Sequence, residues 1–106
     1  MIGQAKFEEI KELAFGSISG AYALVGTTEH PVRIVNIKNG TEGTMFFSTD
    51  GTTDEMVVFK GTGEVYDISA NRGQKASMFV FPVGTTFYVK QISAPTSGSV
   101  YIECIY

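Results

Sequence analysis

The sequence has few of the side chains that enzymes and metal sites most often use. It contains one cysteine, one histidine and no tryptophan among 106 residues. A single cysteine forms neither an internal disulfide nor a cysteine-rich zinc site, and a single histidine leaves few ways to assemble a catalytic set. The composition therefore excludes a disulfide-stapled domain and by itself points to no reaction.

Charged residues and long apolar runs are also scarce. Asp, Glu, Lys and Arg make up 18% of the chain, and the net charge is -3. Nucleic-acid-binding domains usually carry a basic face, which this balance disfavours. No stretch approaches the roughly 18 apolar residues of a membrane-spanning helix, and charges stand where a signal peptide would be apolar. We therefore expect a protein with no nucleic-acid or membrane partner that folds in the cytoplasm where it is made.

Apolar residues recur at helical spacing only near the N-terminus. Phe7, Ile10, Leu13 and Ala14 lie three or four residues apart, with Glu and Lys between them. We predict a short helical arm over residues 1–14, followed by one domain over residues 15–106. A helix this short is unstable alone, so it must pack either on its own domain or on a partner. The sequence leaves both possibilities open.

From residue 15 onward, short runs rich in Val, Ile, Phe, Tyr and Thr alternate with Gly, Asn, Asp and Ser clusters. This pattern is typical of a β-sandwich or barrel. We predict an all-β fold, an antiparallel two-sheet β-sandwich or jelly roll of about eight strands. The predicted strands cover residues 21–24, 32–38, 44–48, 56–59, 64–67, 76–79, 86–91 and 99–105.

The last predicted strand has the clearest alternation. Val100, Ile102, Cys104 and Tyr106 point to one side, and the intervening residues point to the other. We expect Cys104 to be a small buried hydrophobe, and the terminal Tyr106 to lie at a sheet edge or interface where strands of two subunits could pair.

Candidate reactive groups have simple structural interpretations. His30 precedes a proline at the start of a strand, where it is expected to bond to the local backbone. Asp50, Asp54 and Glu55 could gather around calcium, but their spacing does not match a known calcium loop, so an acidic hairpin loop is favoured. We assign no catalytic, cofactor or metal residues, and we do not expect an enzyme.

Aromatic residues are the remaining candidates for function. Phe46–Phe47 and Phe87–Tyr88 each place one ring on either side of a sheet, so one ring of each pair would face water in an isolated monomer. Exposed aromatic rows are typical of partner surfaces. The residues predicted to make assembly contacts are Phe7, Ile10, Phe47, Tyr88, Tyr101 and Tyr106.

Several segments resemble, in the same order, a group of small structural proteins of tailed bacteriophages. They are FGSISGAYALVG at residues 15–26, HPVRI at 30–34, STDGTTD at 48–54, YDISAN at 66–71, GTTFYVK at 84–90 and SAPTSGSVYIE at 93–103. The resemblance implies a non-enzymatic β-sandwich in the virion, made in the cytoplasm of the host bacterium. It leaves open a capsid decoration protein and a collar or head–tail accessory.

The implied partners are capsid, portal or neck subunits, together with further copies of the chain in a homo-oligomer. The alternative function is a carbohydrate-binding β-sandwich module, in which tyrosine rings stack on sugar rings. That alternative requires a concave face with two or more exposed aromatic rings and with Asn, Asp or Gln beside them.

Overall fold

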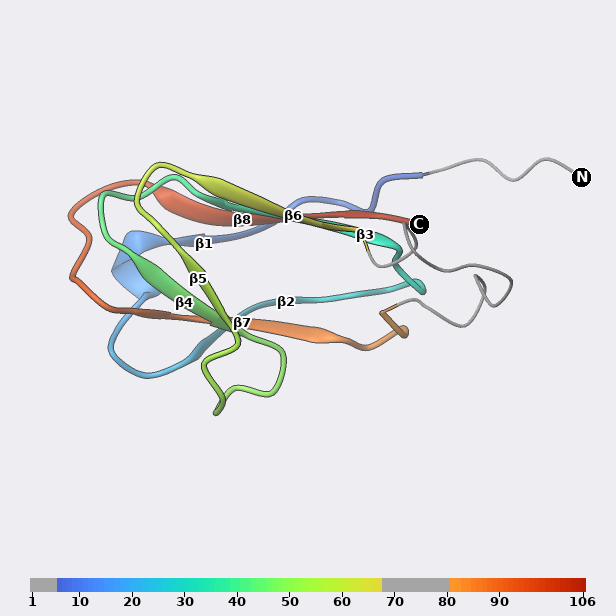
Figure 1. Cartoon of the computed structure of the whole chain (residues 1–106), viewed down its shortest axis with the longest axis horizontal. Helices are drawn as coiled ribbons and strands as arrows, with labels where there is room; N and C mark the ends of the chain where they lie inside the picture. Colours follow the sequence, from blue (N-terminus) through green and yellow to red (C-terminus); the bar gives the residue numbers. More distant parts are fainter. Residues whose placement is uncertain (1–5, 68–80) are drawn as a thin grey trace, which may run out of the picture.

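The computed structural model describes residues 6–67 and 81–106. Two antiparallel four-stranded sheets face each other across the core (Figure 1). Sheet A has the strand order β1-β8-β3-β6, and sheet B has the order β2-β7-β4-β5. The elements are β1 (Lys11–Ala14), the 3-10 turn η1 (Phe15–Ser17), β2 (Ala23–Thr27), β3 (Ile34–Asn39), β4 (Met45–Ser48), β5 (Met56–Val58), β6 (Gly63–Asp67), β7 (Thr86–Gln91) and β8 (Ser99–Ile105).

The prediction of an all-β sandwich is confirmed. Antiparallel pairing joins β1 to β8, β2 to β7, β3 to β6 and β4 to β5, a nested order typical of a jelly roll. Each predicted strand that falls on described residues overlaps an observed strand. The strand predicted at residues 76–79 lies outside the described residues.

The core lies between the sheets and follows from period-two alternation along the strands. Its buried side chains include Val35 and Ile37 of β3, Phe47 of β4 and Phe87 of β7. The Phe87 ring meets Phe81 edge to face, with centroids 6.0 Å apart. The remaining buried hydrophobic residues are Ile18, Val32, Met45, Val58, Val89, Val100, Ile102 and Cys104.

The predicted N-terminal helix is wrong where the structure describes this part of the chain. Lys11–Ala14 is instead the edge strand β1, paired with β8, and Phe7 forms a bridge with Ile105. A helix of this length is not stable by itself, whereas pairing with β8 satisfies the main-chain hydrogen-bonding groups of the segment. The helical spacing of the apolar residues therefore does not indicate which side of this segment is buried.

For the terminal Tyr106 we expected a sheet edge or an interface, and the sheet edge is wrong. Strand β8 lies inside sheet A, between β1 and β3. Its inward alternation is as expected, because Val100, Ile102 and Cys104 are buried. Among the described strands, sheet A instead has its edges at β1 and β6, and sheet B has its edges at β2 and β5.

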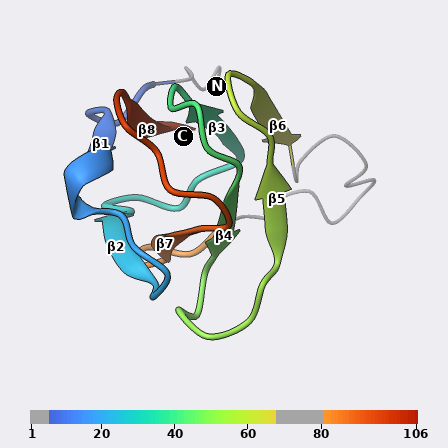
Figure 2. The same ribbon diagram turned by 90° about the vertical axis from the view of Figure 1, so that its left-hand side faces the viewer.

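On one side of the sandwich β1 and β2 lie next to each other (Figure 2), and the Lys11 stem of β1 packs against Gly26 of β2. A Cβ atom placed on Gly26 would lie 2.5 Å from Cδ of Lys11 and 2.8 Å from its Cβ, so only glycine leaves room for this stem. Gly26 also follows a register shift in the pairing of β2 with β7.

Two loops approach each other closely where Gly98 meets Gly40. Gly98 has a φ of 88°, and a Cβ there would overlap the Gly40 carbonyl oxygen. Gly84 has nearly the same φ, 87°, but a Cβ there would meet nothing within 4 Å. Alanine substitution at Gly84 would cost backbone strain alone, whereas at Gly98 it would cost the same strain and a steric clash as well.

We predict that Gly84→Ala lowers the free energy of unfolding by about 1 kcal/mol through strain alone. Gly98→Ala should lower it by at least about 2 kcal/mol more, because the loops must also move apart. Urea denaturation of the two variants tests this. Equal losses would show that the loops separate at no cost.

Candidate interaction surface

Residues 6–10, here called the N-terminal arm, lie along the end of β8 and are fixed there by main-chain hydrogen bonds. The Lys6 amide donates to the Tyr106 carbonyl at 2.7 Å, and the Tyr106 amide donates back to the Lys6 carbonyl at 2.7 Å. The Glu8 amide donates to the Cys104 carbonyl at 2.9 Å. The arm thus continues the antiparallel pairing of β1 beyond the end of that strand.

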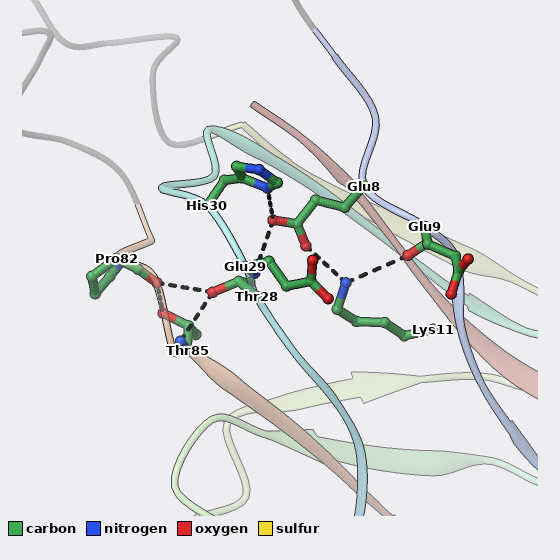
Figure 3. A network of polar contacts seen from close by, with 8 residues as sticks. All are labelled: Glu8, Glu9, Lys11, Thr28, Glu29, His30, Pro82 and Thr85. Atoms are coloured by element: carbon green, nitrogen blue, oxygen red, sulfur yellow. Dashed lines mark hydrogen bonds and ion pairs between the residues drawn. The ribbon is translucent and has the colours of Figure 1, made fainter.

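Glu8 is the one buried residue of the arm, and its carboxylate joins three segments (Figure 3). One oxygen accepts a hydrogen bond from the Lys11 ammonium of β1 at 2.8 Å. The other accepts from the Glu29 amide at 3.0 Å and from Nδ1 of His30 at 2.9 Å, both in the loop between β2 and β3. Because a carboxylate only accepts, Nδ1 must carry the proton.

The electrostatics of this cluster favour an ionised Glu8. Burial by itself would raise the pKa of Glu8, but the hydrogen bonds from Lys11, His30 and the Glu29 amide outweigh it. The pKa therefore lies below the ordinary value of 4.5. The imidazole of His30 is in turn held by the Tyr106 ring, with centroids 3.6 Å apart and planes 5° from parallel.

The arm presents two large apolar side chains to water, beside the exposed residues Lys6 and Glu9. Although main-chain hydrogen bonds of Lys6 and Glu8 attach the arm to β8, Phe7 is 72% exposed and Ile10 is 56% exposed. Both residues were predicted as assembly contacts. An ordered segment that presents large apolar side chains to water is a feature of partner surfaces.

The other predicted contacts do not gather beside the arm. Phe47 is wrong as a contact, because it is fully buried while Phe46 takes the outward position on β4. Tyr88 is half-buried on the outside of sheet B, and Tyr101 is half-buried on sheet A, paired with Lys38 and Glu12. Tyr106 lies near the arm, but His30 covers one face of its ring.

A lysine that the sequence did not single out organises the outside of sheet B. The Lys90 ammonium lies 4.9 Å from the Tyr22 ring centroid and 5.5 Å from that of Phe46. It also pairs with Asp54 at 3.0 Å, and Asp54 accepts a 2.5 Å hydrogen bond from the Tyr22 hydroxyl. These rings are therefore already engaged with Lys90. Only the cross-strand neighbours of Lys90 could have revealed this arrangement.

The acidic loop uses its carboxylates to hold its own backbone. One oxygen of Asp50 accepts hydrogen bonds from the Thr52 and Thr53 amides at 2.8 Å and from the Ser48 hydroxyl at 2.7 Å. These bonds lower the pKa of Asp50. Glu55 accepts from the amide and hydroxyl of Thr49. Within residues 6–67 and 81–106, no three His, Cys, Asp or Glu side chains converge as metal ligands.

Two hollows are candidates for ligand binding. The first is a cavity of about 270 Å³ between the sheets. Its lining residues are Val35, Ile37, Thr49, Glu55, Met56, Tyr66, Phe81 and Phe87. A second hollow, of about 380 Å³, contains one aromatic ring, that of Tyr101. The carbohydrate-binding alternative requires two or more exposed aromatic rings, so this hollow does not meet its requirement. The Lys38 ammonium in its wall is bound to Glu103 at 3.2 Å.

The single histidine and the single cysteine both have structural roles. His30 binds a carboxylate of the arm, which corrects the expectation of a bond to local backbone only. Cys104 is buried as expected, and burial raises the pKa of its thiol to about 11. A thiol with such a pKa is a weak nucleophile near neutral pH.

Comparisons with known proteins provide no family for this chain. No protein-family model matches it, and no curated protein matches it. A solved structure of Bacillus endospore appendages, described as a novel family of disulfide-linked pili, aligns with a TM-score of 0.49 and 14% identity. The alignment covers 98% of this chain and 90% of that one. Among the described residues, no helix is long and apolar enough to span a membrane.

We predict that Asp50→Ala lowers the melting temperature, because the loop loses the acceptor of three hydrogen bonds. Asp50→Asn retains that oxygen and should melt close to the wild type. Differential scanning fluorimetry also tests the calcium alternative. Excess calcium and a chelator should leave the wild-type melting temperature unchanged, since a native-state ligand would raise it. A calcium-dependent rise would show that the loop binds the ion.

We also predict that Cys104 resists alkylation in the native protein. The rise in its pKa from 9.0 to about 11 lowers the thiolate population about a hundredfold at neutral pH, in addition to the shielding by burial. Labelling by a maleimide should be slow in buffer and rapid in denaturant. Equal rates in the two conditions would contradict the burial.

Proposed function

We propose that this chain is a non-enzymatic structural protein of a tailed-bacteriophage virion, and that it binds a neighbouring subunit through its N-terminal arm. The observation that carries the proposal is the exposure of Phe7 and Ile10 on a segment whose main chain is fixed. The ordered sequence resemblance supports the virion as the setting. Capsid decoration and a collar or head–tail accessory role are both compatible with such a contact.

Preorganisation of the arm favours binding through it. Binding costs conformational entropy when a flexible segment must become ordered, and an arm already fixed against β8 avoids much of that cost. Burying Phe7 and Ile10 against a partner would contribute about 1.5–3 kcal/mol each. The contact is proposed to run through side chains, because the Lys11 side chain turns inward from edge strand β1, a feature that discourages strand addition.

The virion assignment is tested on particles of the phage that encodes the chain. We expect mass spectrometry of purified virions to detect the protein in a fixed ratio to the capsid protein, and gold labelling to locate it. A particle reconstruction would distinguish the capsid surface from the neck. Absence from mature virions would overturn the assignment.

The contact itself is tested with particles that lack the protein, to which the purified chain is added back. We predict that Phe7→Ser combined with Ile10→Ser weakens binding at least about a hundredfold, because each of the two lost contacts removes more than about 1.4 kcal/mol. Leu24→Ser is the matched control, since Leu24 is 51% exposed on the outside of sheet B. Equal loss in both variants would contradict docking through the arm.

A further inference from the structure

We propose that Glu8 is an acid-sensitive latch that holds the N-terminal arm on the sandwich and releases residues 6–10 when its carboxylate is neutralised. The sandwich itself stays folded in this transition. The inference concerns the arm alone and does not depend on which partner the arm binds.

Between the arm and the other described residues, few interactions apart from those of Glu8 are present. Its main chain makes three hydrogen bonds to Cys104 and Tyr106 at the end of β8. Its two large apolar side chains, Phe7 and Ile10, are exposed at 72% and 56%, so their burial provides little attachment. Hydrogen bonds near the surface of a segment with little apolar burial open easily.

The Glu8 side chain supplies the missing attachment. With a side chain only 3% exposed, it bridges Lys11 of β1 and the loop that carries Glu29 and His30. The side chain of Lys11 is itself only 11% exposed, so this pair is shielded from screening by salt more than a surface ion pair. Removing the charge of one partner would leave the other buried without compensation, which is costly.

The titratable groups around the carboxylate can be named for each neighbouring segment. Lys11 faces it from β1, and His30 faces it from the loop between β2 and β3, which also carries Glu29 (Figure 3). Cys104 of β8 lies within the fields of Lys11 and Glu8, and Tyr106 stacks behind the imidazole. Glu9 follows on the arm and is exposed.

The sign of the pH dependence follows from the pKa of Glu8, which is lower in the folded protein than the ordinary 4.5. A lowered pKa means that the ionised form stabilises the attached arm. This stabilisation is fully present above pH 4.5 and is lost as the pH falls through the folded-state pKa. Once the carboxyl is neutral, Lys11 and His30 lose the negative charge that lies between them.

The test is amide hydrogen exchange followed by NMR on Glu8→Gln, which keeps the size and the acceptor oxygen but removes the charge. At pH 7, we expect the amides of Lys6 and Tyr106 to exchange at least about tenfold faster than in the wild type, a change of about 1.4 kcal/mol. The amides of β3 should keep their wild-type rates. As the pH falls below 4.5, the wild-type and Glu8→Gln rates should converge.

Two further variants complete the design. Glu9→Gln removes a charge from the exposed neighbour and should leave the arm unchanged, whereas Lys11→Met removes the partner cation with little loss of packing and should loosen the arm. Unchanged rates for Lys6 and Tyr106 in Glu8→Gln would overturn the proposal. An equal increase throughout β3 would also overturn it, because the arm would then open only with the whole sandwich.

Discussion

Strand β8 hydrogen-bonds along both of its sides, to β1 and to β3, while Val100, Ile102 and Cys104 point from it into the core. Each of these side chains is at most 1% exposed, so the strand contributes both main-chain pairing and apolar burial. The edge strand β1 reaches the sheet through β8, and the N-terminal arm lies along its end. The position of the candidate interaction surface therefore depends on this strand.

The arm is held in an unusual manner for a segment of a β-sandwich. Main-chain bonds and a buried carboxylate fix it, whereas its largest side chains remain in water. Apolar burial would have used Phe7 and Ile10 for attachment and left nothing for a partner. Attachment through Glu8 separates the two tasks, since the inward side holds the arm and the outward side is free to bind. It also makes the attachment sensitive to charge.

Period-two alternation was sufficient to predict most strands and the inward face of β8, because burial between two sheets imposes that period directly. The alternation could not show which ring of Phe46 and Phe47 is buried, since each side of strand β4 carries one phenylalanine. Met45 shares the phase of Phe47 and was the available signal for the inward side. The helical spacing of Phe7 and Ile10 misled for a different reason, because pairing with a strand almost a full chain length away overrode the local preference.

The polar contacts of the candidate site were beyond prediction from the sequence alone. Glu8, His30 and Tyr106 come together only through the pairing of the arm with β8, and nothing in their spacing marks them as neighbours. Asp50 shows the opposite case, in which residues close in sequence resemble a metal loop but cap a turn. The role of a carboxylate depends on which groups donate hydrogen bonds to it, and these donors are known only once the fold is known.

The nested strand order also determines when the protein can fold during synthesis. Lys11 pairs with Ile102, and Val35 pairs with Cys104, so the centre of sheet A is contributed by a strand that is synthesised after the other described strands. Until then β1 lacks its neighbour β8, and β3 has one side with unpaired main-chain donors and acceptors. Contacts between such distant segments form slowly, and open strand edges invite aggregation. The nascent chain therefore has to remain soluble until β8 has been made, and Lys6, Glu8 and Glu9 give the arm charge during that interval.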